Sequence, residues 1–264
     1  MTGWKAIWLT FFYIIIGTLI QVGLLSILHL LDIEGERYWI LHEVSMTIGI
    51  VTSFYIFYKI LIKKEAIPKK DFIDFKSSRL FLLPFIAIGL FLFDKIFFDG
   101  YHYIFTDNFK IEKFNIKSIQ FNYVDLIYLI SPLILAPLLE EIVFRKYIFM
   151  KLLEKNSLIP SVLISSLCFS LIHFPNFRNL IPTFIFGIIA AYLFYKTKNI
   201  LYPIMLHFFG NLLWAILKYY DNGLQENLQG IKFSLLYWFI TLSGFAIVVI
   251  LTKLFLRNIK KAET

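Results

Sequence analysis

Eight apolar stretches of membrane-spanning or nearly spanning length divide this sequence. A helix needs roughly 20 residues to cross the hydrocarbon core of a bilayer, which is about 30 Å thick. The chain has 264 residues, of which 59% are hydrophobic, and this is more than a soluble domain needs to fill its core. We therefore predict an all-α, polytopic integral membrane bundle with about eight transmembrane helices, near residues 6–31, 38–62, 80–98, 123–150, 158–174, 180–197, 199–219 and 233–256.

Helix packing must supply the stability of this bundle. The one cysteine, Cys168, excludes an intramolecular disulfide and a multi-cysteine metal site, and we expect it to be a packing residue. Gly187 and Ala191 have the small-xxx-small spacing that lets membrane helices approach closely. The apolar run after Lys5 is too long for a signal-peptide core and lacks a small-residue cleavage site, so we expect a retained first span. We find no repeat or second domain and predict a single membrane domain over residues 1–264.

The basic residues indicate the orientation of the chain. If both termini are cytoplasmic, most of the 26 Lys and Arg residues fall in segments on the cytoplasmic side, with a large group between residues 59 and 79. The positive-inside rule therefore predicts a multi-pass protein of the cell membrane with cytoplasmic N- and C-termini. A basic face against anionic lipid also explains most of the net charge of +8. We thus expect the lipid bilayer, and no nucleic acid, as a partner, and the sequence leaves the oligomeric state open.

Two carboxylates and an arginine lie within the fourth apolar stretch, where charged side chains are costly and are usually functional. Glu141 and Arg145 are four residues apart, about 40° round a helix axis, so they can form an ion pair. Glu140 lies about 140° from Arg145 and is free to act on water as a general base. Pro132 and Pro137 disturb the helix just before the pair and leave backbone groups that water or neighbouring spans must satisfy. The alternative is that both glutamates are packing or interface charges.

Two histidines lie in other apolar stretches. Phe169 and His173 are four residues apart, so the aromatic ring can shield the imidazole from lipid. His207 and Asn211 have the same spacing and present an imidazole and a carboxamide in one direction. Taken singly, a histidine on a helix is more often a hydrogen-bonded packing residue than a ligand.

A free glutamate, two histidines and an asparagine together provide the groups for hydrolysis inside a membrane. Two histidines with an acidic or amide oxygen can bind Zn²⁺ and leave a position open for water. Without a metal, Glu140 can deprotonate a water that one histidine holds, while the other histidine and Asn211 donate hydrogen bonds to the tetrahedral intermediate. The sequence pattern does not choose between these two sites.

Two further polar pairs are weaker candidates. His42 and Glu43 begin like the zinc-protease pattern H-E-x-x-H, but Met46 replaces the second histidine, and we interpret them as an interface pair. Asp94 and Lys95 lie near the end of the third apolar stretch. They can form a local or interspan ion pair, or line a path for substrate.

These residues resemble three motifs of the CAAX-protease and bacteriocin-processing family of intramembrane endopeptidases, also called the Abi or CPBP family. The motifs are E-E-x-x-x-R, F-x-x-x-H and H-x-x-x-N, and they occur here in order, as Glu140-Glu141 with Arg145, Phe169 with His173, and His207 with Asn211. The resemblance covers a catalytic core of about residues 123–215 and leaves residues 1–120 and 220–264 as accessory spans. Lys146 departs from the family, in which glycine often follows the arginine.

The resemblance implies a role for each motif residue. Glu140 would activate water. His173 and His207 would be catalytic or would bind a divalent metal such as Zn²⁺, and Asn211 would complete the oxyanion or metal site. The supporting residues would be Glu141, Arg145 and Phe169.

We therefore predict an intramembrane endopeptidase that hydrolyses a peptide bond of a membrane-associated peptide or protein. The resemblance to bacterial members of the family suggests bacteriocin or pheromone peptide maturation, or self-immunity. The main alternative is a non-enzymatic membrane immunity or sensor-partner protein with the same fold. A transporter that uses Glu140 and the histidines as a proton relay is disfavoured because the sequence shows no inverted repeat.

Overall fold

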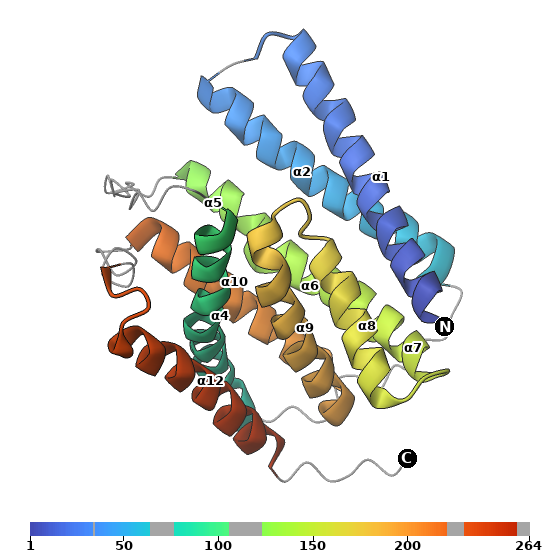
Figure 1. Cartoon of the computed structure of the whole chain (residues 1–264). Helices are drawn as coiled ribbons and strands as arrows, with labels where there is room; N and C mark the ends of the chain where they lie inside the picture. Colours follow the sequence, from blue (N-terminus) through green and yellow to red (C-terminus); the bar gives the residue numbers. More distant parts are fainter. Residues whose placement is uncertain (34, 64–76, 106–122, 221–229, 258–264) are drawn as a thin grey trace.

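The chain is a bundle of helices, and the part of it that the structure describes contains no strands. The computed structural model describes residues 1–33, 35–63, 77–105, 123–220 and 230–257. In Figure 1 the helices lie side by side, and the first two form a long antiparallel pair along one flank of the rest. Helices are expected in lipid, because each helix satisfies its own backbone hydrogen bonds.

The first half of the described chain contains α1 (Gly3–Leu30), α2 (Gly35–Phe57), η1 (Tyr58–Ile62), α3 (Ser77–Leu80) and α4 (Leu83–Phe105). A continuous but irregular rod follows, built from α5 (Tyr123–Ile130), η2 (Ser131–Leu135), α6 (Ala136–Glu141), η3 (Ile142–Phe149) and α7 (Met150–Leu153). The last helices are α8 (Leu158–Leu171), α9 (Phe177–Thr197), α10 (Leu201–Tyr220) and α12 (Leu235–Leu256). The segments η1, η2 and η3 are π-helical, and such turns often mark functional sites.

Each of the eight predicted stretches corresponds to one helical rod, and the all-α membrane fold is confirmed. Five helical stretches are long and apolar enough to cross a bilayer, namely Gly3–Leu30, Arg37–Ile62, Phe177–Thr197, Leu201–Lys218 and Leu235–Leu256. The third stretch differs most from its predicted bounds, because α4 continues to Phe105 and a short α3 precedes it. Helix α8 has only 14 residues. The number of spans beyond these five therefore stays a prediction.

Small residues let pairs of helices approach closely. A Cβ atom on Gly187 of α9 would lie only 2.9 Å from the Cβ of Ser166 on α8, so the backbones meet at this point. Gly89 of α4 and Gly244 of α12 face each other in the same way, since a Cβ on Gly244 would lie 2.7 Å from the Gly89 carbonyl oxygen. Contacts of this kind replace the hydrophobic driving force that is missing between helices in lipid. The predicted packing role of Gly187 is confirmed, and Cys168 is likewise buried in the core.

The start of α1 lies beside the turn between α7 and α8, at one end of the bundle (Figure 1). The side-chain amide of Asn156 in this turn donates a hydrogen bond to the Met1 carbonyl oxygen over 3.1 Å. Four predicted spans separate the two segments, and an even number of spans returns the chain to the same side of a membrane. The assignment of this side to the cytoplasm stays a prediction from the basic residues.

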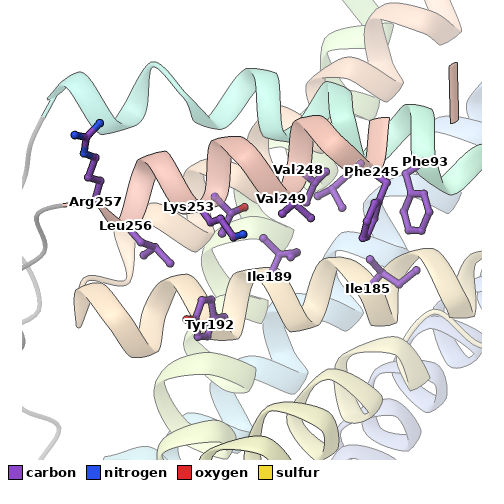
Figure 2. A pocket seen from close by; sticks show the side chains of 12 residues that line it. Phe93, Ile185, Ile189, Tyr192, Phe245, Val248, Val249, Lys253, Leu256 and Arg257 are labelled. Carbon is purple, nitrogen blue, oxygen red and sulfur yellow. The ribbon is translucent and has the colours of Figure 1, made fainter. Parts of the chain in front are cut away.

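A groove of about 530 Å³ runs between α4, α9 and α12. Figure 2 shows its apolar lining side chains, with Lys253 and Arg257 toward one end. None of the seven motif residues lines this groove. Five of them, Glu140, Phe169, His173, His207 and Asn211, line a different cavity, near the middle of the irregular rod.

Candidate active site

All four residues predicted to perform the chemistry line one cavity of about 610 Å³. Glu140 comes from α6 and His173 from the turn that follows α8, whereas His207 and Asn211 both come from α10. Phe169, also a motif residue, lines the same cavity. The three motifs, which are far apart in the sequence, therefore converge on one place in the bundle.

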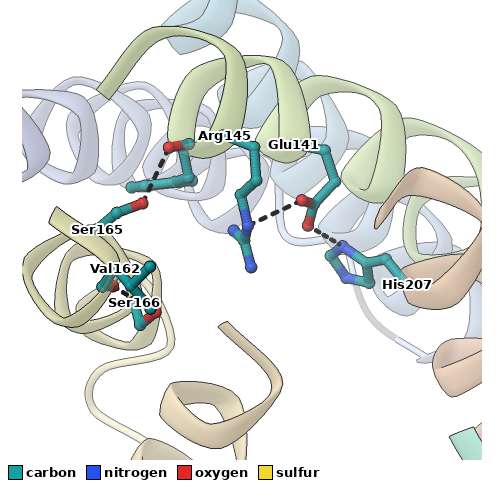
Figure 3. Close-up of polar contacts among 7 residues, drawn as sticks. Glu141, Arg145, Val162, Ser165, Ser166 and His207 are labelled. Carbon is teal, nitrogen blue, oxygen red and sulfur yellow. Dashed lines mark hydrogen bonds and ion pairs between the residues drawn. The ribbon is translucent and has the colours of Figure 1, made fainter. Parts of the chain in front are cut away.

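The predicted ion pair between Glu141 and Arg145 is confirmed. The Nε atom of Arg145 lies 3.0 Å from Oε2 of Glu141, and both side chains have no exposed surface. The other carboxylate oxygen, Oε1, lies 3.1 Å from Nδ1 of His207 on α10 (Figure 3). The sequence did not reveal this second contact, because residues 141 and 207 are distant along the chain. Glu141 therefore links α6 to α10, the helix that carries His207 and Asn211.

Phe169 packs against both the cation and the imidazoles of the site. The Arg145 guanidinium carbon lies 4.1 Å from the centroid of the Phe169 ring, within the range of a cation–π contact. The same ring lies 5.2 Å from the His173 ring and 5.6 Å from the His207 ring, measured between centroids. Phe186 of α9 completes this packing, 5.1 Å from the His207 ring. The predicted shielding of His173 by Phe169 is thus confirmed, and Phe169 also covers His207.

The hydrogen bonds of the two histidines determine which ring nitrogen of each remains available to bind a ligand. Nδ1 of His173 lies 3.1 Å from the Phe169 carbonyl oxygen, and Nδ1 of His207 lies 3.1 Å from the Glu141 carboxylate. Because a carbonyl or carboxylate oxygen only accepts, both Nδ1 atoms carry the hydrogen and donate. Each ring thus keeps its Nε2 atom for a water, a substrate or a metal ion, and this is the usual arrangement around metal-binding histidines.

Asn211 satisfies a backbone group that the two prolines leave unpaired. In η2 the amide of Ala136 bonds to the carbonyl of Ser131, five residues earlier. A bond of the same spacing to the Pro132 carbonyl would come from the backbone nitrogen of residue 137. That residue is Pro137, whose nitrogen has no hydrogen to donate. Asn211 Nδ2 donates to the Pro132 oxygen over 2.6 Å instead. Of the two predicted partners for the freed backbone groups, water or a neighbouring span, the structure shows the neighbouring span for Pro132. Asn211 Nδ2 keeps one further hydrogen.

Glu140 has the freedom that its position on the helix predicts. Only 9% of the residue is exposed, and among the described residues its Oε2 atom has no hydrogen-bond partner. A buried carboxylate oxygen without a partner is costly unless water or a ligand binds it. Glu140 is therefore placed to bind a water molecule within the cavity.

The weaker candidates agree with the predictions in part. Lys95 does not pair with Asp94, and its Nζ lies 3.1 Å from Oδ2 of Asp99 instead, because residues four apart on a helix share a face. Asp94 lines the cavity, as the substrate-path alternative has it. Nδ1 of His42 lies 3.9 Å from Oε1 of Glu43. Glu43 also lines the cavity, so its interpretation as only an interface residue was incomplete.

Four lining residues that sequence reasoning missed come from α9. Asn179 and Thr183 are polar residues four apart on an apolar stretch, the same signal that identified the histidine motifs. Pro182 and Phe186 carry no such signal, because a proline and an aromatic ring are common in membrane helices. Only the packing of α9 against α8 and α10 brings them to the cavity.

Residues 122–213 match the family model for the type II CAAX prenyl endopeptidase Rce1-like family. The segment is similar to an Rce1-like domain. The match covers about a third of the chain and includes all seven motif residues. It supports the resemblance to the CAAX-protease and bacteriocin-processing family. Neither a curated protein nor a solved structure matches the chain.

The metal-binding atoms of this segment are of the types that a divalent metal prefers, but they are not close enough together to hold one ion. Two imidazole Nε2 atoms, a carboxylate and an amide oxygen are donors that Zn²⁺ accepts. Within the described ranges, however, no group of three or more His, Cys, Asp or Glu residues is close enough to hold an ion. Glu140, His173 and His207 therefore do not converge as a ready-made metal site.

Proposed function

We propose that this multi-pass membrane protein is an intramembrane endopeptidase, which hydrolyses a peptide bond of a membrane-associated peptide or protein. The observation that carries the proposal is the convergence of Glu140, His173, His207 and Asn211 on one cavity inside a membrane bundle. The match of residues 122–213 to a family of endopeptidases supports the same reaction class.

Glu140 and His173 activate the water molecule in this proposal. The unpartnered Oε2 of Glu140 and the Nε2 lone pair of His173 each accept one hydrogen bond from a water molecule. Glu140 takes the proton while the water oxygen forms a bond with the peptide carbon, and the carbonyl π electrons move onto the oxygen. The tetrahedral intermediate then breaks its carbon–nitrogen bond, and the proton on Glu140 passes to the leaving amine.

Stabilisation of the oxyanion belongs to Asn211 and His207. Asn211 has one Nδ2 hydrogen left after its bond to Pro132, and a preorganised amide donor is suited to a developing negative charge. His207 becomes a donor at Nε2 when it is protonated beside Glu141. Protonation also balances the charges of the site, since Glu140 and Glu141 then face Arg145 and an imidazolium. A buried cluster with no net charge is less costly than one with an uncompensated carboxylate.

A divalent ion such as Zn²⁺ is the second candidate for this site. His173 and His207 would hold it through Nε2 with Glu140, after a movement that brings the three side chains closer than they are in this structure. The ion would supply Lewis-acid polarisation of the peptide carbonyl and a more acidic water. The functions of Glu141 and of the Phe169 carbonyl in orienting the imidazoles would be the same in both cases.

We infer that the physiological substrate is a peptide involved in bacteriocin or pheromone maturation or in self-immunity, with the termini of the enzyme in the cytoplasm. The inference rests on the motif resemblance and on the distribution of basic residues. The rival is a protein that keeps this fold and acts by binding alone, as an immunity or sensor-partner protein. The two differ in whether the function needs Glu140 as a base.

Comparison of membrane peptidomes tests the proposal. Cells that carry the unmodified protein, Glu140→Gln, His173→Ala or the control Glu154→Gln are compared at equal expression. Glu154 is an exposed residue that pairs with Lys151 outside the cavity. We expect one or more cleavage products to vanish in the first two variants and to remain in the control. Retention of all products, or rescue of a cellular phenotype by Glu140→Gln, would refute hydrolysis and support the binding protein.

A further inference from the structure

Asp94 of α4 is a buried carboxylate that the proposed reaction does not use. Only 9% of the residue is exposed, and it lines the same cavity as Glu140. Its Oδ1 atom has no hydrogen-bond partner among the residues that the structure describes. It lies outside residues 122–213, so the match to the Rce1-like family assigns it no role.

Among the residues that the structure describes, the neighbouring cations do not neutralise Asp94. Lys95 and Lys232 both bind Asp99, at 3.1 Å and 3.3 Å from its carboxylate oxygens. Lys218, at the far end of the cavity lining on α10, lies over the Trp214 ring at 5.1 Å from its centroid. A carboxylate in an apolar bundle is costly without a partner, and such residues in membrane helices often mark a path for a substrate or an ion.

The described lining of the cavity has the opposite charge to the protein. Its lining contains Glu43, Asp94 and Glu140, whereas Lys218 is the one lysine or arginine among the described lining residues. The complete chain has a net charge of +8. An acidic cavity inside a basic protein attracts positive groups, and the apolar walls strengthen the attraction by lowering the local dielectric constant.

The walls near Asp94 fit the stem of a long basic side chain. From α4 itself the cavity is lined by Ala87, Leu90, Phe91 and Phe98, all apolar. Lysine and arginine bury their methylene stems against such surfaces while the charged head reaches a polar group. A carboxylate oxygen without a competing partner is the complementary group for an ammonium or a guanidinium.

We propose that Asp94 binds a lysine or arginine side chain of the substrate and so directs hydrolysis to peptide bonds near a basic residue. The proposal rests on the endopeptidase function described above and names the substrate class for the same cavity. It also predicts that acidic side chains are rejected, since a second carboxylate beside Asp94 would be repelled in a medium of low dielectric constant.

Binding to an inactive enzyme tests this subsite without requiring cleavage. The full-length Glu140→Gln protein in lipid nanodiscs is titrated with fluorescent, otherwise apolar peptides that carry Lys, Gln or Glu at one position, which is moved along the peptide. At one position we expect the Lys peptide to bind about tenfold more tightly than the Gln peptide, a preference within the range of one buried charged contact. Adding Asp94→Asn should reduce this preference to less than about twofold.

Asp99→Asn in the same Glu140→Gln background is the matched control. It removes one carboxylate from the same helix, at a residue that does not line the cavity, and should preserve the preference for Lys. Asp94→Lys should reverse the preference toward the Glu peptide. Equal binding of the Lys and Gln peptides to the Glu140→Gln protein, or a preference that survives Asp94→Asn, would overturn the subsite.

Cleavage of the same peptides by protein with an intact Glu140 separates this proposal from the proposed function. Cleavage with no preference for Lys would support the endopeptidase function and refute the subsite at Asp94. A preference in binding that depends on Asp94, with no cleavage of any peptide, means that the cationic site stands and hydrolysis is wrong. Cleavage near Lys that becomes indifferent to charge in Asp94→Asn supports both.

Discussion

Oε1 of Glu141 lies 3.1 Å from Nδ1 of His207, and this contact joins two helices that no sequence motif connects. The other oxygen of the same carboxylate lies 3.0 Å from Nε of Arg145. One buried side chain thus orients an imidazole and neutralises a guanidinium. Glu141 is therefore a positioning residue, whereas Glu140 next to it faces the cavity.

Glu141→Gln should slow hydrolysis without abolishing it. Glutamine retains an oxygen that can accept from His207, but it loses the charge that holds the imidazolium and Arg145. We expect kcat to fall about 10–100-fold, the usual effect of removing a partner that orients a histidine, with KM nearly unchanged. Glu140→Gln should lower kcat by about 10²–10⁴-fold, because it removes the base itself. Steady-state kinetics on a peptide identified in the peptidome provide the measurement, and equal losses in the two variants would contradict this division of roles.

Arg145→Met should destabilise the bundle more than the corresponding double variant. The single change leaves Glu141 buried without its cation, and breaking a buried pair in this way costs about 3–5 kcal/mol. In Glu141→Gln with Arg145→Met the uncompensated charge is absent, so part of the stability should return. Unfolding of the purified protein in detergent, measured for all four members of the cycle, gives the coupling energy. A coupling energy near zero would mean that the ion pair does not contribute to the fold.

Asn211→Leu should affect both stability and hydrolysis, and Pro137→Ala should separate the two effects. Loss of the carboxamide leaves the Pro132 carbonyl without its donor, which costs about 1–3 kcal/mol. Pro137→Ala supplies a backbone N–H in the register that serves Pro132, so it should reduce this loss of stability. It should not restore hydrolysis, because the donor to the oxyanion is still missing. Recovery of both stability and kcat would show that Asn211 acts only through the helix.

The sequence predicted those parts of the structure that depend on short spacings. Hydropathy over about 20 residues located the helices, because a bilayer fixes their length. A separation of four residues identified the ion pair of Glu141 with Arg145 and the packing of Phe169 on His173, since a helix places such residues on one face.

Contacts between residues far apart in the sequence could not be predicted from these short spacings. The bond between Glu141 and His207 and the exposure of Asp94 to the cavity depend on how α4, α6 and α10 rotate about their axes. That rotation is decided by packing over the whole bundle. The partner of Lys95 was left open for a related reason. The local ion pair forms with Asp99, which shares the face of Lys95, whereas the adjacent Asp94 points in another direction.

Gly187→Val should loosen the contact between α8 and α9. An added Cβ would lie 2.9 Å from the Ser166 Cβ, so one helix must move, and overpacking of this kind costs about 1–3 kcal/mol. Phe186, next to Gly187, lines the cavity, so catalysis should weaken as well. Gly23→Val in α1 is the control, since a Cβ there meets nothing within 4 Å. Thermal unfolding of the two variants in detergent should differ clearly, and equal midpoints would mean that α8 and α9 adjust without cost.

Removal of divalent metal should leave hydrolysis intact if the side chains alone activate water. The described donors do not converge on an ion, and the unpartnered Oε2 of Glu140 is available to act as a base. We expect protein treated with 1,10-phenanthroline and dialysed to keep its kcat within about twofold, a change too small for the loss of a catalytic ion. Elemental analysis of the purified protein should find less than one zinc per chain. A loss of activity that added Zn²⁺ reverses would instead show that His173 and His207 move together to hold the metal.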